Sequence, residues 1–354
     1  MSRSLLSHER VPIRHLLAYG WLPSAVKKWA YRTFRGYRIG KSVKLSFGCV
    51  IEGKDVELQD HVEIGLMTIV EGRSIRIGRH SSIGMLCYIS CPRIEIGEDA
   101  KIREQVSIGG PKLPESSFSL GSRTVVLQRT SINPTMPVVI GDDSGIGGHC
   151  LIFTHSSWLN ILHGYPVSYE PVTIGKSVWL PWRVFVMPGA NIGDGSVIGA
   201  NSLVLGNIPP RSLAVGSPAR VVKQAPDFPR ALDNTVRRKL IVQILNEFER
   251  LLSSEGIQIQ ESGSFRIYSK NGRAYRLLHL DSHSTSATKC NREDTVLSDI
   301  TIPEEQKATY RKDRVSWLDL EANIRSDAGS PLMEELALFL GRYGIRLQRD
   351  RASH

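Results

Sequence analysis

Long apolar runs, paired cysteines and a secretory leader are all missing from this sequence. No run approaches the roughly eighteen consecutive apolar residues of a membrane-spanning helix, so no span is expected. The five cysteines of the 354-residue chain are scattered and form no CxxC pair, which favours reduced packing residues over a disulfide framework. The amino terminus lacks a charged start followed by an apolar core and a small-residue cleavage site. Together these absences predict a cytoplasmic protein.

Positive charge predominates, because the chain has a net charge of +10 and a pI near 9.4. This balance favours anionic partners, and a phosphate-bearing cofactor, an anionic lipid surface and nucleic acid are three such classes. Nucleic acid is the least supported of them, since the sequence contains no C2H2 finger spacing, RNP-like aromatic motif or basic leucine zipper. No nucleic-acid partner is therefore expected.

The stretch 172–205 repeats aliphatic residues at a spacing that neither a helix nor an amphipathic strand produces. A helix places apolar residues three and four positions apart, and a half-buried strand places them at every second position. The spacing in this stretch is six, at Ile174, Leu180, Val186, Ile192, Ile198 and Val204. A small or β-branched residue stands four positions after each, at Val178, Val184, Ala190, Ser196, Ser202 and Ile208. Repeats this short must stack to bury their apolar faces, which predicts a parallel β-helix.

The same six-residue pattern recurs along most of the first two thirds of the chain. Further blocks begin at Ile39, Leu58, Ile77, Ile96 and Ile140, and two long breaks fall at about 110–137 and 155–172. Each hexapeptide is predicted to form one flat side of a triangular coil, with its aliphatic side chain inside and successive coils about 4.8 Å apart. Glycine after the aliphatic residue, as at Gly141 and Gly175, is interpreted as serving a tight backbone turn.

These patterns divide the chain into three predicted parts: a basic helical cap (1–38), the β-helix (39–223) and an α+β accessory region (224–354). Residues 15–37 predict one or two short helices, broken near Pro23, with a basic face. Such a segment is expected to cover the open end of the coil stack. The basic face is also interpreted as a peripheral contact with the inner face of an anionic membrane, and the two interpretations are compatible.

The accessory region lacks the six-residue pattern and reads as a mixture of helices and strands. An amphipathic helix is predicted over 233–255, with Val236, Leu240, Ile244, Phe248 and Leu251 on one side. A hairpin is predicted to turn at Asn271-Gly272, and a second helix is predicted over 330–348 with Gly344 as its stop. The composition of 281–299 is typical of a loop. None of these elements indicates a function.

Three motifs in the repeat carry a resemblance to a known family: "VTIGKSVWLP", "VMPGANIGDGSVIGANSLV" and "IPPRSLAVGSPARVVK". They resemble the left-handed β-helix acyltransferases, which include sugar O-acetyltransferases, galactoside and maltose acetyltransferases, and xenobiotic acetyltransferases. The resemblance covers about 39–223 and is densest over 138–223. It implies an all-β left-handed parallel β-helix, acetyl-CoA as acyl donor, and a homotrimer whose clefts lie between neighbouring subunits.

A histidine in the second long break carries the proposed chemistry. The resemblance implies that His155 is the general base, which deprotonates an acceptor hydroxyl so that it attacks the acetyl-CoA thioester. Imidazole suits this task because its ordinary pKa lies near 6.5. His163, in "HGYP", is a second candidate for the base or for acceptor binding, and Tyr165 is assigned to the acceptor with it. His149 lies inside a repeat, where its side chain is expected to point outward.

Other residues are assigned around this base by the same resemblance. Glu170 is placed on the substrate side, where it either orients the imidazole or is a plain surface carboxylate. Trp179 matches a family tryptophan near the acetyl and acceptor end of the cleft. No Ser-His-Asp or Cys-His motif occurs nearby, which favours direct transfer over an acyl-enzyme.

The cofactor side is assigned to Trp182, Ala200, Arg220 and Lys223. Trp182 and its neighbour depart from the usual "VWIG" pattern, so Trp182 either narrows the pantetheine slot or stacks on the cofactor. Arg220 and Lys223 match basic family positions that would meet the phosphates of CoA, although two cations at a domain edge are otherwise simply solvated. The usual Thr-Lys-Asp before Ile-Pro-Pro is replaced by "LGN" at 205–207, so one phosphate contact is missing.

Three functions are compatible with some or all of these sequence features. The first is acetyl transfer from acetyl-CoA to a hydroxyl of a sugar or glycan, with no metal expected. The second is a zinc enzyme of the γ-carbonic anhydrase kind, which needs three His ligands shared between subunits. His80, His149 and His155 are available, but His80 lies about seventy residues from the others. The third is a non-catalytic scaffold, which has no use for His155, Trp179 or Arg220. The first interpretation accounts for most motifs.

Overall fold

The computed structural model describes residues 13–280, 290–327 and 329–350. The chain folds into two compact units, Met1–Ala231 and Leu232–His354. None of the helices in these described ranges combines the length and the apolar character that crossing a membrane requires.

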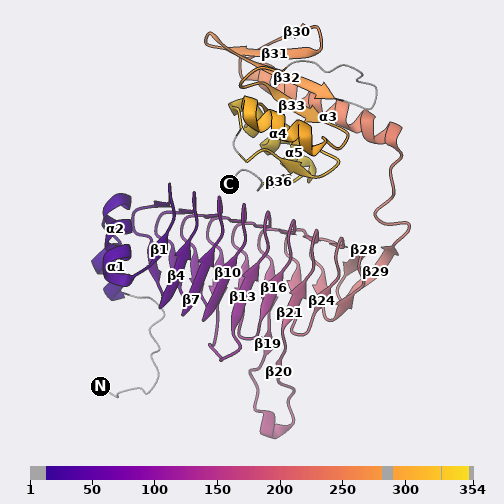
Figure 1. The fold of residues 1–354 in the computed structure, drawn as a ribbon. Coiled ribbons are helices and arrows are strands. Elements are labelled where there is room, and N and C mark those ends of the chain that lie inside the picture. Colours follow the sequence, from indigo (N-terminus) through magenta and orange to yellow (C-terminus); the bar gives the residue numbers. More distant parts are fainter. Residues whose placement is uncertain (1–12, 281–289, 328, 351–354) are drawn as a thin grey trace. The chain divides into compact units, whose positions relative to one another are not determined.

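The first unit is a three-sided prism of parallel strands, one sheet to each side (Figure 1). Side A contains β1 (Arg38–Ile39), β4 (Asp55–Leu58), β7 (Ser74–Ile77), β10 (Arg93–Ile96), β13 (Ser117–Leu120), β16 (Val138–Ile140), β21 (Val172–Ile174), β24 (Asn191–Ile192) and β27 (Asn207–Ile208). Side B contains β2 (Lys44–Leu45), β5 (Glu63–Ile64), β8 (Ser82–Ile83), β11 (Lys101–Ile102), β14 (Val125–Val126), β17 (Gly145–Ile146), β22 (Trp179–Leu180), β25 (Val197–Ile198), β28 (Ser212–Gly216) and the antiparallel β29 (Ala219–Gln224). Side C contains β3 (Val50–Glu52), β6 (Ile69–Glu71), β9 (Tyr88–Ser90), β12 (Ser107–Gly109), β15 (Ser131–Asn133), β18 (Leu151–Phe153), β23 (Phe185–Val186) and β26 (Leu203–Val204).

The six-residue ladder forms the core of this prism, as predicted. Ile174, Leu180 and Val186, one on each side of a single coil, are all completely buried. Each residue pairs in register with the equivalent residue of the next coil, so Ile174 lies beside Ile192. The aliphatic side chains thus stack in continuous columns, and the prediction of a parallel β-helix is confirmed.

The corners of the prism differ from the predicted turns. Left-handed backbone falls on the third residue after the aliphatic one, as at Ser177 (φ 54°), which follows Ile174. Gly141 has no such conformation, but a Cβ added to it would lie 2.7 Å from the carbonyl carbon of Gly175 in the next coil. Glycine at this position therefore permits the close approach of two coils, and the predicted tight-turn role is wrong.

The predicted break at 110–137 is wrong for most of its length, because it contains a complete coil. The core residues of this coil are spaced by six and fully or almost fully buried: Leu120, Val126 and Ile132. Thr124 and Thr130 are also buried, and their hydroxyls donate 2.7 Å hydrogen bonds to the carbonyls of Gly141 and Gly147 in the next coil. A segment with many hydroxyl side chains is therefore packed rather than irregular.

The loss of phase between blocks also has a local cause. Leu58 follows Ile51 by seven residues, and Ile77 follows Val70 by seven. Both extra residues lie where the chain passes from side C to side A. The longer corner does not displace the two flanking strands, which stay paired in register with the equivalent strands of the neighbouring coils. The seven-residue spacing therefore does not disturb the stack.

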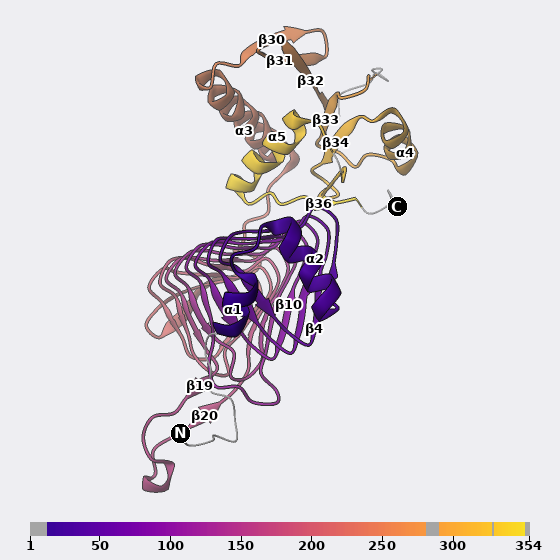
Figure 2. The same cartoon turned by 90° about the vertical axis from the view of Figure 1, so that its left-hand side faces the viewer.

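Two helices cover the open end of the first coil, α1 (Ile13–Tyr19) and α2 (Ser24–Arg35), with Pro23 at the N-cap of α2 (Figure 2). The Lys27 ammonium is buried and donates 2.9 Å hydrogen bonds to the carbonyls of Ser46 and Cys49. The Tyr31 hydroxyl accepts a 3.1 Å hydrogen bond from the Ile51 amide. The helices therefore satisfy backbone groups that an uncapped edge would leave unpaired.

The second predicted break is a real excursion from the sixth coil, between β18 and β21. Its two limbs pair as antiparallel strands, β19 (His155–Ser156) and β20 (Ser168–Tyr169). A short 3-10 helix, η1 (Ile161–His163), lies at its far end (Figure 1). This excursion, residues 155–169, is called the arm.

The second unit contains one mixed sheet with an apolar core on each face. Its elements are α3 (Asn234–Ser254), β30 (Gln258–Ser262), β31 (Phe265–Lys270), β32 (Arg273–Leu280), β33 (Thr295–Ser298), α4 (Glu304–Asp313), β34 (Ser316–Asp319), β35 (Ile324–Arg325), α5 (Pro331–Leu340), η2 (Gly341–Tyr343) and β36 (Gln348–Arg349). The strands lie in sequence order across the sheet. Phe248 of α3 and Leu336 of α5 belong to one core, whereas Tyr310 of α4 belongs to the other.

The hairpin and both helices predicted in this unit are present. Asn271 and Gly272 have φ values of 51° and 77° and form the two-residue loop between β31 and β32. Asp233 caps α3 by accepting a 2.8 Å hydrogen bond from the Val236 amide. The predicted apolar side of α3 is rotated, because Val236 is 40% exposed whereas Ile241 is buried.

Two other expectations for this unit are corrected. Residues 295–298 of the predicted loop form the buried strand β33, and 281–289 lie outside the described residues. The helix α5 ends at Leu340, and Gly344 (φ 79°) ends the following η2 instead. A short buried strand and a 3-10 turn both lack a periodic signal long enough to read in the sequence.

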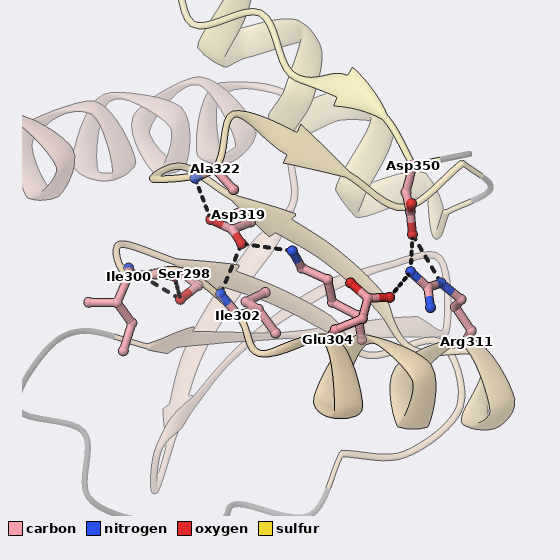
Figure 3. A network of polar contacts seen from close by, with 9 residues as sticks. Ser298, Ile300, Ile302, Glu304, Arg311, Asp319, Ala322 and Asp350 are labelled. Atoms are coloured by element: carbon pink, nitrogen blue, oxygen red, sulfur yellow. Dashed lines mark hydrogen bonds and ion pairs between the residues drawn. The ribbon is translucent and has the colours of Figure 1, made fainter. Parts of the chain in front are cut away.

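A buried ion pair joins α4 to the sheet of this unit (Figure 3). The Asp319 carboxylate is fully buried, lies 3.3 Å from the Lys307 ammonium, and accepts 2.9 Å and 2.8 Å hydrogen bonds from the amides of Ile302 and Ala322. Because both charges are buried with partners, removing either would leave the other uncompensated. The pair therefore holds the loop before α4 in place.

Candidate functional site

His155 lies at the root of the arm, where the chain leaves side C. Its ring is half-buried and stacks between two aromatic rings, with centroid distances of 5.9 Å to Tyr169 and 6.5 Å to Phe153. Nδ1 is buried and has no hydrogen-bond partner among the described residues. The imidazole is thus held in one orientation by stacking contacts, and the chain itself covers its Nδ1.

The other arm candidates lie at two different places. Glu170 is at the returning end, where its carboxylate accepts a 2.7 Å hydrogen bond from the Ser168 hydroxyl and packs over Gly189 of the next coil. His163 is exposed in η1 at the far end, with Nε2 3.5 Å from the side-chain Nδ2 of Asn160. Tyr165 follows η1 and is 47% exposed. Only Glu170 therefore shares the root of the arm with His155.

Two tryptophans form an aromatic shelf on side B and its corner with side C. Trp179 in β22 covers Gly145 of the preceding coil, where an added Cβ would lie 2.5 Å from its ring. Trp182, at the corner, covers Gly148 in the same way, also at 2.5 Å. Their rings are 37% and 43% exposed, so both remain accessible. Glycine in one coil thus lets an indole from the next lie flat on the prism.

The remaining cofactor candidates continue this surface towards the end of the prism. Ala200 occupies the same corner as Trp182, one coil later, since the Asn201 amide donates to the Trp182 carbonyl. Arg220 in β29 pairs with Val215, next to that corner, whereas Lys223 pairs with Leu213 further along the strand. Both cations are exposed. Trp182, Ala200 and Arg220 therefore lie along one edge of the molecule.

The predicted residues fall into two groups on different parts of the prism. His155 and Glu170 belong to the corner between sides C and A, whereas Trp179 lies on side B and Trp182 at the corner between sides B and C. A triangular cross-section keeps these groups apart within one chain. The two groups would form one site only where the His155 corner of one copy meets side B of another.

The three histidines considered for zinc lie at three different corners. His80 stacks on His61 at 4.6 Å between sides A and B, His149 lies 5.7 Å from the Trp182 ring, and His155 is on the arm. Among the described residues, no three His, Cys, Asp or Glu side chains come close enough to hold a metal ion. The described residues of one chain therefore form no such cluster by themselves, and the zinc alternative depends on ligands shared between subunits.

Comparison with known proteins gives partial matches within the repeat. No family model matches the sequence. Galactoside O-acetyltransferase of Escherichia coli K12 is 36% identical over 124 residues, which is 32% of this chain and 60% of that protein. A Staphylococcus aureus Mu50 protein that bears the name of an acetyltransferase is 47% identical over 75 residues, 20% of this chain and 37% of its own. The chain thus spans less than two thirds of these relatives.

Over these matched segments the repeat domain is similar to hexapeptide-repeat acetyltransferases. This similarity agrees with the resemblance carried by the three sequence motifs and with the stacked coils of the structure. Family members are left-handed β-helices.

Solved structures resemble this hexapeptide-repeat domain only in part. The polySia-specific acetyltransferase NeuO has a TM-score of 0.36 and 18% identity, and covers 56% of this chain and 90% of its own. LpxA of Bacteroides fragilis, a UDP-N-acetylglucosamine acyltransferase, has a TM-score of 0.44 and 16% identity, and covers 64% and 82%. At these TM-scores, neither structure indicates the activity of this chain.

The sequence did not point to the two rings that hold His155. Phe153 packs against Phe185 of the next coil with centroids 5.5 Å apart, and Tyr169 reaches His155 because β20 returns beside β19. The one feature of the sequence that indicated these contacts was the arm itself, because the two segments that flank such a loop must meet at its root. Their pairing register, His155 opposite Tyr169, appears only in the structure.

Proposed function

We propose that this protein transfers an acetyl group from acetyl-CoA to a hydroxyl of a sugar or glycan. The observation that carries the proposal is the His155 imidazole, which is half-buried and stacked on Tyr169 at the root of the arm. The similarity of the repeat domain to hexapeptide-repeat acetyltransferases supports the acyl donor, and the galactoside O-acetyltransferase relative supports a sugar hydroxyl as acceptor. The exposed indoles of Trp179 and Trp182 offer apolar surface for the pantetheine arm.

The reaction is direct transfer. The His155 imidazole takes the proton of the acceptor hydroxyl, whose oxygen attacks the thioester carbonyl carbon. The carbon–sulfur bond then breaks, and the CoA thiolate leaves and takes up the proton. Cys150, in the same coil, is an unsuitable nucleophile, because it is buried and burial raises the pKa of its thiol to about 11. This favours a ternary complex over an acyl-enzyme.

The functional assembly is proposed to be a homotrimer with the site between copies. His155 and Trp179 belong to different parts of the prism, so a complete site needs the corner of one subunit and side B of another. Glu170, His163 and Tyr165 would then face the acceptor, and Arg220 and Lys223 would contact the CoA phosphates. Symmetry would provide three equal sites.

The proposed location is the cytoplasm, with peripheral attachment at the inner face of the membrane. The basic amino-terminal cap supports the attachment through its charge. Such a location suits an acceptor that is large or held at a surface.

The first test replaces His155 by Ala. Turnover of acetyl-CoA with a panel of sugar and glycan acceptors should fall by about two to four orders of magnitude, as loss of a general base does. His61→Ala, at the corner between sides A and B, is the control and should retain most of the turnover. Equal activity of His155→Ala and the natural protein would remove His155 from the mechanism, and no thiol release with any acceptor would count against the reaction.

The second test asks whether the site is shared. His155→Ala and Trp179→Ala are purified separately and then refolded or expressed together with different tags. If His155 and Trp179 of different subunits form one site, the mixed oligomers should recover activity that neither variant has alone. Recovery is not expected if both residues serve a site within one chain, and a monomer in light scattering would also contradict the assembly.

A further inference from the structure

The outward side of α2 exposes large apolar side chains beside Arg32 and Arg35, although the helix buries a lysine. Lys27 and Tyr31 face the first coil and are fully buried. The exposed residues include Val26 (43%), Trp29 (57%) and Phe34 (65%), and the rings of Trp29 and Phe34 meet edge to face at 5.4 Å. A helix that buries a lysine but leaves Trp29 and Phe34 outside has a second surface to contact.

The apolar surface extends over α1 and the link between the helices. Ile13 and Leu17 of α1 are 59% and 66% exposed, and Trp21 in the link is 62% exposed. Figure 2 shows α1 and α2 lying together across the end of the prism. The set is called the cap face and consists of Ile13, Leu17, Trp21, Val26, Trp29 and Phe34.

The charge of residues 10–51 indicates which kind of partner the cap face binds. Residues 10–51 contain nine Lys and Arg residues and no Asp or Glu. Arg14, Arg32 and Arg35 are exposed on the two helices that carry the cap face, although the Arg32 guanidinium also donates hydrogen bonds to the carbonyls of Ile39 and Gly40. The Glu52 carboxylate lies 3.4 Å from the His15 ring, so cations are in excess around the helices but not alone. Aromatic and aliphatic side chains among an excess of cations are typical of segments that lie at the boundary between headgroups and acyl chains. Charge complementarity therefore points to an anionic lipid surface.

We propose that the cap face binds a membrane surface rich in anionic lipid. Trp21, Trp29 and Phe34 insert among the headgroups, and the three exposed arginines contact lipid phosphates. The inference deepens the proposed function and rests on it, because it holds the enzyme where glycans attached to lipids are presented. The proposal also explains why Lys27 is buried, because it requires the large apolar residues Trp29 and Phe34 on the surface of α2 that contacts the lipid.

The coil stack sets the distance of the candidate site from this membrane. The cap covers the first coil, and the arm leaves the sixth. Five steps of about 4.8 Å place the root of the arm about 24 Å from the capped end. An acceptor hydroxyl on a lipid-anchored molecule must therefore reach about that far from the headgroups, which favours an extended glycan over a single sugar at the surface.

Vesicle sedimentation of the full-length protein tests the binding. The protein should bind vesicles of phosphatidylcholine with phosphatidylglycerol about tenfold more tightly than phosphatidylcholine alone, and high salt should weaken the binding. Trp29→Ser with Phe34→Ser should reduce binding about tenfold or more, and Arg14→Gln with Arg32→Gln should abolish the preference for anionic vesicles. Trp158→Ser is the matched control, because Trp158 is 96% exposed on the arm and outside the cap face.

Several outcomes would overturn the inference. Equal binding to both vesicle types, or an equal loss with Trp158→Ser, would remove the cap face as a lipid-binding surface. If Trp29→Ser with Phe34→Ser instead dissociates an oligomer in light scattering, and the natural protein binds no vesicles, the cap face contacts another copy of the chain. Retained binding by His155→Ala, with lost acetyl transfer, would separate this inference from the catalytic proposal.

A second measurement tests the orientation. A fluorescent label is placed on Thr33→Cys in α2 or on Leu162→Cys in the arm, in a Cys290→Ser background, because the other four cysteines are buried. Quenchers on lipid headgroups should quench the label at position 33 and leave the one at 162 unaffected. Stronger quenching at 162 would reverse the proposed orientation.

Discussion

The rings of His155 and Tyr169 stack across the antiparallel pair at the root of the arm, with centroids 5.9 Å apart and planes inclined by 18°. The Tyr169 hydroxyl lies 3.2 Å from the Ser157 hydroxyl, which ties the ring to the outgoing limb. The imidazole therefore owes its orientation to a residue fourteen positions later in the chain. Tyr169 is a positioning residue for the proposed base.

Replacing Tyr169 tests this positioning role. Tyr169→Ala should lower kcat about tenfold to a hundredfold, because a misplaced base loses proximity to the hydroxyl it deprotonates. Tyr169→Phe keeps the ring and should stay within about twofold of the natural protein. Steady-state kinetics with acetyl-CoA and an accepted sugar measures both. A large loss in Tyr169→Phe would assign the role to the hydroxyl rather than to stacking.

Arg220 and Lys223 are expected to differ in their effects on the cofactor. Arg220 pairs with Val215 beside the corner of Trp182 and Ala200, whereas Lys223 lies further along β29. Arg220→Ala should raise KM for acetyl-CoA about tenfold, which corresponds to one hydrogen bond to a charged group at about 1.5 kcal/mol. Lys223→Ala should raise it less, and kcat should change little in both. A change confined to the KM of the acceptor would count against the phosphate role.

Gly141 and Gly206 provide a matched pair for the close approach of coils. Gly141→Ala should destabilise the prism by about 1–3 kcal/mol, because its Cβ would meet the backbone of Gly175 at 2.7 Å. Gly206 has no atom within 4 Å of an added Cβ, so Gly206→Ala should be neutral or slightly stabilising. Urea unfolding followed by circular dichroism distinguishes them, and equal stabilities would refute the packing explanation.

The cap should become less stable in mild acid because of His15. Burial lowers the pKa of His15, an effect that Glu52 opposes and Arg35 reinforces. A histidine with a lowered pKa binds fewer protons when folded, so its contribution is complete above the ordinary value of about 6.5 and declines as the pH falls through the folded pKa. The pH dependence of thermal unfolding should therefore be smaller in His15→Gln. His163→Gln, on the exposed arm, should match the natural protein at every pH.

Much of the core could be predicted because the repeat is local. Each buried aliphatic residue, such as Ile174 or Ile192, stands at a fixed distance from the last, and the alternation of a strand makes every such residue point inward. The Asn271-Gly272 hairpin was equally readable, since both residues must adopt left-handed backbone. Local backbone geometry was sufficient in these cases.

The coil from Leu120 to Ile132 was not predicted although its own residues match the repeat. Leu120, Val126 and Ile132 are six positions apart, with Thr124 and Thr130 at the small or β-branched position. Its flanks obscure it, because Ile108 lies twelve residues before Leu120 and Ile140 lies eight residues after Ile132. The structure shows its place in the stack, since the hydroxyls of Thr124 and Thr130 bond to carbonyls of the next coil.

By itself, the sequence determined that the chain forms stacked three-sided coils capped by basic helices, because period, turn residues and charge are properties of neighbouring positions. Only the tertiary structure decided which candidate site residues lie close to one another. It placed His155 beside Tyr169 and Trp182 beside Ala200, and it put these pairs at different corners of one prism. The physical reason is that extra residues at some corners change the spacing along the chain while hydrogen bonds between coils keep the strands in register.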